Sequence, residues 1–243
     1  MSSRPILIML TGDVPAKIIG ETGNFDAMFL RMADYSGTGA VVRDVARGEE
    51  PDEPDRYAGT IVTGSPAMVT DREAWSEKSG EWLRRAVLAG HKVLGVCYGH
   101  QLMAQALGGT ADYLPYRMEL GTQTVTMRPG LPRHPLLPDL PPTFEVNLIH
   151  SQTVTELPHG ATALAYNEND AHQIIAYGPN AVSTQFHPEF DQAVTRSYID
   201  LIAGRATPEQ RAREKGIRLG FPAGETPESA NILRRFVSLC REE

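Results

Sequence analysis

The chain has 243 residues, of which 41% are hydrophobic and 22% are charged, as in ordinary globular proteins. Its net charge is −7 and its basic residues are scattered, so we expect no nucleic-acid-binding surface. No stretch approaches the roughly 20 apolar residues of a membrane span, so no membrane partner is expected either. The two cysteines, Cys97 and Cys240, are too few for a disulfide framework, which favours a reducing, cytoplasmic location.

Strand and helix signals alternate along the first 110 residues. The strands are short, continuous apolar runs, which are typical of parallel strands covered on both faces. Between them lie segments with apolar residues at helical spacing, and the connections are short. This alternation predicts a parallel sheet with helices on both faces. The expected strands are 5–10, 40–45, 59–63 and 92–96, and the expected helices are 24–35, 73–89 and 98–107.

The pattern of predicted elements changes after residue 110. Short β-rich pieces are separated by turns that carry Pro and Gly, and the segment 128–142 contains six prolines, which predicts an irregular loop. Helical patterns return at 191–204, in a charged stretch from 205 and at 228–240, where the apolar residues share one face. The expected strands of this half include 122–127, 144–148, 161–166 and 174–177.

The predicted fold class is therefore α/β. We expect an open, mostly parallel, flavodoxin-like sheet with helices on both faces, an antiparallel β-rich second half and a helical C-terminal extension. No linker or internal repeat interrupts the chain. The predicted organisation is one domain over 1–204, with the extension 205–243 packed on the same domain.

Cys97 ends an apolar run and stands between Gly95 and Gly99. Small neighbours are needed where a buried strand turns sharply into a helix and presents a nucleophile. The side chain would then lie at the carboxyl edge of the sheet, beside a helix N-terminus whose partial positive charge favours a thiolate. The alternative is a small core residue, since free cysteine is often buried. The flanking glycines favour the nucleophile.

A cysteine nucleophile needs a base and a group that orients the base. His187 and Glu189 are two residues apart, and in extended backbone such residues point to the same side. Pro188 biases the preceding His187 towards extended backbone. The alternative interpretation of this segment is a strand that ends in a polar turn.

The stretch Gly95–Gln101 (GVCYGHQ), together with Gln185–Phe190 (QFHPEF), resembles the class I glutamine amidotransferases, whose nucleophile motif is G-x-C-x-G-x-Q. The resemblance spans roughly residues 6–202. It implies that Cys97 is the nucleophile, that His187 is the general acid and base, and that Glu189 orients His187. The C-terminal extension resembles that of stand-alone members, including γ-glutamyl peptidases.

The resemblance also implies an oxyanion hole. The stretch Thr63–Pro66 (TGSP) follows the third predicted strand, where the family usually has a G-G-P loop that supplies one backbone N–H. Ser65 replaces the second glycine and keeps the N–H, and the backbone N–H of Tyr98 is the second expected donor. Gly64 and Gln101 are expected to contact the substrate; the alternative for Gln101 is an ordinary helix-surface residue.

The stretch His150–Val154 (HSQTV) is similar to the H-G-D-x-V stretch in the glutaminase part of GMP synthetase. Ser151 replaces the glycine and Gln152 replaces the aspartate, which argues against GMP synthetase itself. The resemblance makes His150, Ser151 and Gln152 candidate substrate-binding residues. Glu119 is either an acidic residue near the site or a solvated charge at a strand end.

The resemblance implies that glutamine loses its side-chain amide through a thioester on Cys97. The leading hypothesis is a stand-alone glutaminase that passes ammonia to a separate synthase. The alternatives are a hydrolase of γ-glutamyl peptides or amides that needs no partner, and a non-catalytic binding member. No cofactor and no metal are expected, because the sequence has no phosphate-binding loop and the C-x-x-H spacing of Cys97 and His100 has no second pair.

Overall fold

The computed structural model describes residues 4–35, 39–115, 118–205 and 221–242. Within these residues the chain forms a nine-stranded sheet in the order β2-β1-β3-β4-β11-β10-β9-β6-β7, and β5 pairs with β8 in a separate ribbon. The strands are β1 (Ile6–Leu10), β2 (Ala40–Asp44), β3 (Gly59–Val62), β4 (Val93–Val96), β5 (Thr110–Tyr113), β6 (Glu119–Met127), β7 (Thr143–His150), β8 (Gln152–Glu156), β9 (Thr162–Tyr166), β10 (Ile174–Ala176) and β11 (Ala181–Thr184).

The sheet has a parallel half and an antiparallel half. Strands β2, β1, β3, β4 and β11 pair in parallel, whereas β10, β9, β6 and β7 continue the sheet in antiparallel pairs. The predicted fold class is confirmed, including the change from parallel to antiparallel strands. In the central pair, Val96 of β4 is opposite Thr184 of β11, so the segments that follow these two strands emerge side by side.

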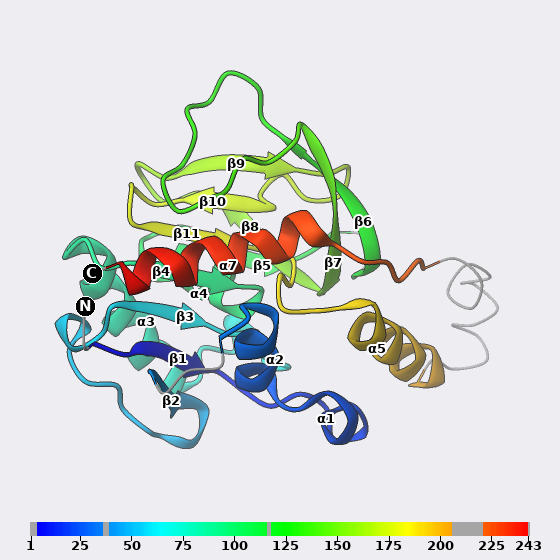
Figure 1. Ribbon diagram of the computed structural model, residues 1–243, viewed down its shortest axis with the longest axis horizontal. Helices are drawn as coiled ribbons and strands as arrows, with labels where there is room; N and C mark the ends of the chain where they lie inside the picture. The colour runs from blue at the N-terminus through cyan, green and yellow to red at the C-terminus, as the bar shows by residue number, and fades with distance from the viewer. Residues whose placement is uncertain (1–3, 36–38, 116–117, 206–220, 243) are drawn as a thin grey trace.

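Helices cover both faces of the parallel half (Figure 1). Leu7 and Met9 of β1 pack into the core beneath α3 and α4, whereas Ile6 and Leu10 belong to the core beneath α2 and α7. This alternation follows from the two-residue period of a strand. The α-helices are α1 (Ala16–Thr22), α2 (Phe25–Met32), α3 (Ala74–Leu88), α4 (Tyr98–Ala106), α5 (Gln192–Arg205) and α7 (Pro227–Arg241).

The boundaries of the predicted elements agree with the structure to within a few residues, and the segment 128–142 contains no helix or strand, as expected. Strands β5, β8 and β11 were not among the expected strands. The short helix α1 was not predicted, because seven residues that include Gly20 carry too little pattern. The expected charged helix after residue 205 falls mostly on residues 206–220, which lie outside the described residues. None of the helices in the described part of the chain is both long and apolar enough to cross a bilayer.

Candidate active site

Cys97 lies at the sharp turn between β4 and α4, at the carboxyl edge of the sheet. Its backbone has φ 51° and ψ −99°, a conformation that L-residues rarely adopt. The turn is crowded: a Cβ on Gly99 would lie 2.6 Å from the carbonyl oxygen of Val62, and one on Gly95 would lie 2.7 Å from that of Gly99. Glycine is therefore needed at both positions, and the strained turn directs the Cys97 thiol into a cleft.

His187 and Glu189 come from the segment that follows β11. The Nδ1 atom of His187 lies 2.7 Å from Oε1 of Glu189, and both side chains are almost fully buried. The sequence led us to expect extended backbone here. Instead, Phe190 donates a backbone hydrogen bond to the His187 carbonyl (3.3 Å), so the two side chains meet across a tight turn. The His187 N–H is bonded to the Asn147 carbonyl (2.9 Å), which ties the turn to β7.

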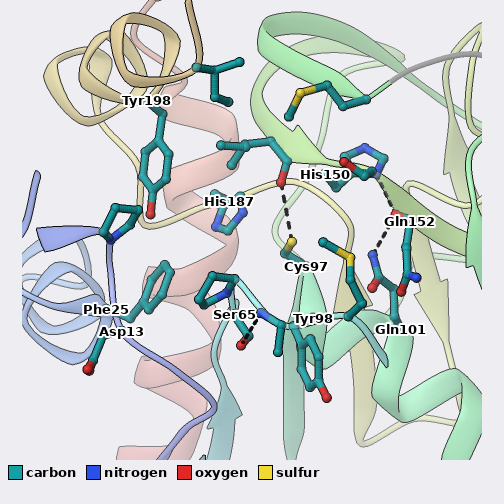
Figure 2. A pocket seen from close by; sticks show the side chains of 18 of the residues that line it. Asp13, Phe25, Ser65, Cys97, Tyr98, Gln101, His150, Gln152, His187 and Tyr198 are labelled. Atoms are coloured by element: carbon teal, nitrogen blue, oxygen red, sulfur yellow. Dashed lines mark hydrogen bonds between the residues drawn. The ribbon is translucent and has the colours of Figure 1, made fainter. Parts of the chain in front are cut away.

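Burial and charge act in opposite directions on His187. Burial disfavours the imidazolium, but the Glu189 carboxylate and the Cys97 thiolate together raise the pKa of His187 to about 10. The Nε2 atom of His187 has no hydrogen-bond partner in the described chain. Figure 2 shows the ring beside Cys97. The arrangement can hold a thiolate against an imidazolium whose free N–H faces the cleft, as nucleophilic catalysis by cysteine requires.

Aromatic rings hold the plane of the His187 imidazole. The Phe190 ring stacks on it at 4.1 Å between centroids with an interplanar angle of 13°. The Tyr198 ring of α5 stacks on Phe190 at 5.1 Å between centroids. The Phe25 ring of α2 lies 6.4 Å from His187 and nearly parallel to it. Elements far apart in sequence thus fix one ring orientation.

Ser65 and Tyr98 each present a backbone N–H to the site. Neither N–H has an acceptor among the described residues, and both residues line the cleft. The Ser65 hydroxyl donates to the Thr11 carbonyl (2.7 Å) and accepts from the Ala67 N–H (3.1 Å), so the side chain braces the loop and leaves its N–H available. Gly64 does not line the cleft; a Cβ there would lie 2.8 Å from Cε1 of His187, so this position gives the imidazole room.

The cleft has a volume of about 240 Å³ and passes across the Cys97 thiol. In Figure 2 Gln101, His150 and Gln152 lie on one side of Cys97, and Phe25, Asp13 and Tyr198 lie on the other. The residues that line the cleft come from the loops after β1, β3, β4 and β11, from the β5–β6 and β7–β8 connections, and from α2, α4 and α5. They are Asp13, Pro15, Phe25, Ser65, Pro66, Ala67, Met68, Cys97, Tyr98, Gln101, Met118, Ile149, His150, Ser151, Gln152, His187, Tyr198, Leu201 and Ile202.

The side-chain amides of Gln101 and Gln152, at one end of the cleft, form hydrogen bonds with other residues of the protein. Gln101 is 4% exposed and is not an ordinary helix-surface residue; its Nε2 donates to the Gln152 carbonyl (2.7 Å) and to Oε1 of Gln185 (3.0 Å). The Gln152 side chain accepts from the Val69 N–H (3.1 Å) and donates to the Thr70 hydroxyl (2.6 Å). The hydrogen bonds of these two side chains therefore fix the shape of this end of the cleft.

His150 and Ser151 complete that end. The two ring nitrogens of His150 lie 2.8 Å from the Gln152 carbonyl and 2.8 Å from the Glu119 carboxylate. Both neighbours carry acceptor oxygens, so each ring nitrogen of His150 has a hydrogen-bond partner, and the ring is held between Gln152 and Glu119. Glu119 is 2% exposed, so it is not a solvated charge at a strand end. Although burial opposes its charge, the hydrogen bond and charge of His150 hold the pKa of Glu119 below its usual value. Ser151 is half-buried and borders the cleft.

Several cleft residues were not singled out from the sequence. Asp13, Pro15 and Phe25 come from the first 25 residues, and Tyr198 and Leu201 come from α5. No short motif marks them, because their place at the site depends on how distant elements pack. The Ile149 carbonyl oxygen, which lies 3.6 Å from the Cys97 sulfur, was likewise not predicted from the sequence.

Comparison with known proteins agrees with this fold. Residues 30–200 match the family model described as glutamine amidotransferase class-I. The chain therefore belongs to the class I glutamine amidotransferase family. It is 27% identical over 205 residues to gamma-glutamyl peptidase 5 of Arabidopsis thaliana, covering 81% of this chain and 78% of that protein. It is 34% identical over 131 residues to a glutamine-hydrolyzing GMP synthase of Thermomicrobium roseum, covering 54% of this chain and 23% of that protein.

The fold also matches a solved structure. A glutamine amidotransferase from Thermotoga maritima superposes with a TM-score of 0.72 at 18% identity, and the match covers all of both chains. At this level of identity the likeness establishes the fold.

Proposed function

We propose that the protein hydrolyses γ-glutamyl amides, glutamine among them, through a thioester on Cys97. The observation that carries this proposal is the constellation around the thiol. An imidazole held by a buried carboxylate faces Cys97. Beside it lie two backbone N–H groups that have no acceptor in the part of the chain that the structure describes. Nucleophile, proton carrier and oxyanion donors are the parts that acyl transfer from an amide needs.

In the proposed first step, the Cys97 thiolate attacks the amide carbon, and the carbonyl oxygen takes up negative charge against the Ser65 and Tyr98 N–H groups. The C–N bond then breaks, and the departing nitrogen takes the proton from Nε2 of His187. In the second step, the now neutral His187 accepts a proton from water as its oxygen adds to the thioester. The C–S bond breaks, which releases glutamate and the thiolate, and Glu189 keeps the ring oriented throughout.

We assign the γ-glutamyl half of the substrate to the polar end of the cleft. The candidate contacts are Gln101, His150, Ser151 and Gln152. Their mutual hydrogen bonds give this wall a fixed shape before substrate arrives, which lowers the entropic cost of binding. Gly64 contributes by admitting the His187 ring next to the thiol.

In the form of the proposal that we prefer, water accepts the γ-glutamyl group from Cys97 and no partner protein is needed. The support is that the relative matching 81% of the chain is named a γ-glutamyl peptidase, whereas the GMP synthase match covers 54%. The second candidate is delivery of ammonia from glutamine to a separate synthase subunit, supported by the glutamine-hydrolyzing relative. Slow glutamine turnover that rises on addition of a synthase would favour this second form.

The test combines labelling with kinetics. Cys97→Ser is expected to lower kcat/KM on γ-glutamyl substrates by at least about 10³-fold while the protein stays folded. A thiol-reactive glutamine analogue is expected to label Cys97 in the native enzyme, as detected by mass spectrometry, and to leave Cys240 unlabelled. Undiminished hydrolysis by Cys97→Ser would contradict the proposal, and absence of both labelling and turnover would support a non-catalytic binding protein instead.

A further inference from the structure

We propose that the cleft contains a subsite for an apolar substituent on the leaving nitrogen, so that the preferred substrates are γ-glutamyl amides of alkyl or aryl amines rather than glutamine itself. This inference rests on the proposed function, because it uses the direction in which the amide nitrogen departs. The subsite is formed by five residues of α1, α2, α5 and their flanks: Pro15, Phe25, Tyr198, Leu201 and Ile202.

The position of His187 defines where the leaving group lies. Its Nδ1 is taken by Glu189, so the proton for the departing nitrogen comes from Nε2. The ring is flanked by Phe25, and the stack through Phe190 ends at Tyr198. A group attached to the departing nitrogen therefore enters the part of the cleft bordered by Phe25 and Tyr198.

The two ends of the cleft differ in chemistry. Gln101, His150, Ser151 and Gln152 at one end offer amide, hydroxyl and backbone groups, which suit the amino acid part of a γ-glutamyl substrate. The leaving-group end is lined mainly by aromatic and aliphatic side chains, and its polar groups are the Tyr198 hydroxyl and the Asp13 carboxylate (Figure 2). Leu201 and Ile202 follow Tyr198 by three and four residues, so the same face of α5 continues the apolar wall.

When the leaving group is ammonia, nothing covers the apolar side chains at this end of the cleft. A hydrocarbon substituent on the leaving nitrogen would cover these side chains and remove them from water, which is favourable. A peptide leaving group would carry a free carboxylate to the same place, and burying a charge against apolar side chains is costly. The carboxylate of Asp13 at the edge of the cleft adds no attraction for an anion and is already paired with Arg47 and Asn24. An uncharged apolar substituent is thus the occupant that fits.

The experiment measures kcat/KM for glutamine, for the γ-glutamyl methyl, ethyl, propyl and butyl amides, for the anilide and for γ-glutamyl-glycine. Straight-chain alkylamines have nearly equal basicity, so differences among their amides report contacts rather than leaving-group chemistry. We expect kcat/KM to rise with each methylene, by up to about fourfold for complete burial. The butyl amide and the anilide are expected to exceed both glutamine and γ-glutamyl-glycine.

Matched variants locate the effect. Leu201→Ser and Ile202→Ser are expected to reduce the rise per methylene to about twofold or less, because each replaces apolar wall with a hydroxyl. Leu88→Ser is the control, since Leu88 ends α3 and its side chain is 69% exposed. Thermal melts of all three variants establish that they are folded when compared.

A flat or falling series in the wild-type enzyme, or a preference for γ-glutamyl-glycine, would overturn the subsite. An unchanged slope in both α5 variants would do the same. In each of these cases labelling of Cys97 and loss of activity in Cys97→Ser would leave the proposed function intact. Failure of every γ-glutamyl compound to react, with no labelling, would overturn the proposed function and the subsite together.

Discussion

At the residue scale, Cys97 combines a thiol that lines the cleft with a strained backbone. Its φ of 51° brings Cβ close to neighbouring backbone, and such conformations cost about 1–3 kcal/mol. Glycine would adopt the same conformation without this cost. The strained backbone at Cys97 therefore lowers the stability of the fold, and it directs the thiol into the cleft.

Replacing Cys97 separates the two effects. We expect Cys97→Gly to exceed Cys97→Ala in free energy of unfolding by about 1 kcal/mol, because alanine retains the strained Cβ and glycine removes it. Both variants lack the thiol and are expected to be inactive. Urea denaturation followed by circular dichroism measures the difference. A more stable Cys97→Ala would mean that the turn is not strained in solution.

The charge of His187 links the site to pH. The pKa of this residue in the folded protein, about 10, is above its ordinary value of 6.5. The stability that comes from its protonation is thus complete below pH 6.5 and is lost as the pH rises through 10. In the proposed mechanism the same deprotonation removes the proton that the leaving nitrogen would take from His187.

Glu189→Gln is expected to move the basic limb of the kcat/KM profile to lower pH by about 1–3 units, because the carboxylate is a main cause of the raised pKa of His187. The profile is measured between pH 6 and 11 on a γ-glutamyl substrate in buffers of constant ionic strength. Glu145→Gln, at an exposed position on β7, is the control and leaves the limb in place. If the basic limb of the kcat/KM profile keeps its position in Glu189→Gln, a group other than His187 controls this limb.

At the scale of elements, the glycines around Cys97 set how α4 packs on β3 and β4. The close approach of Gly99 to the Val62 carbonyl leaves no room for a methyl group. Gly20, on the exposed side of α1, has no atom within 4 Å of a Cβ placed on it. The two positions therefore separate packing from intrinsic helix propensity.

We expect Gly99→Ala to lower the free energy of unfolding by about 1–3 kcal/mol, because backbone must move to accept the methyl group. Gly20→Ala is expected to raise it by up to about 1 kcal/mol, since alanine is the better helix former. Chemical denaturation of both variants under identical conditions gives the comparison. Equal effects at the two positions would contradict the tight packing of α4.

At the scale of the whole molecule, α7 shares a core with the sheet. Ile232, Leu233, Phe236 and Val237 are each at most 5% exposed and belong to the same apolar cluster as Leu94 of β4. Asn147 of β7 connects this region to the site: its amide donates to the Phe190 carbonyl (3.0 Å). It also contacts the Gly224 carbonyl and the Thr226 hydroxyl, ahead of α7. We therefore propose that the extension and the sheet unfold as one unit.

Phe236→Ala is expected to cost about 3–5 kcal/mol, because it leaves a cavity in the shared core. Arg235→Ala, on the exposed side of the same helix, is expected to change stability by less than about 0.5 kcal/mol. A single cooperative transition in calorimetry, at lower temperature in Phe236→Ala, is the predicted result. A separate early transition for α7 would show that the extension unfolds independently.

Local pattern was enough to predict the alternating strands and helices before residue 110 and the position of Cys97 between β4 and α4. These features depend on the spacing of apolar residues and on the glycines next to Cys97. Both are properties of a short stretch of sequence. The pairing of His187 with Glu189 was also predicted, although the backbone between them forms a turn rather than an extended strand.

Only the tertiary structure decided what surrounds the thiol. Phe25, Tyr198 and Leu201 reach the cleft because α2 and α5 pack beside it. The buried Glu119 carboxylate accepts hydrogen bonds from the side-chain amides of Asn167 and Gln173, which lie in the β9–β10 connection. Sequence by itself determined the strand-to-helix turn that carries Cys97, since a turn of this kind is a local feature. The cleft, its apolar end and the partners of buried charges depend on contacts between distant segments, and those are fixed only when the whole core packs.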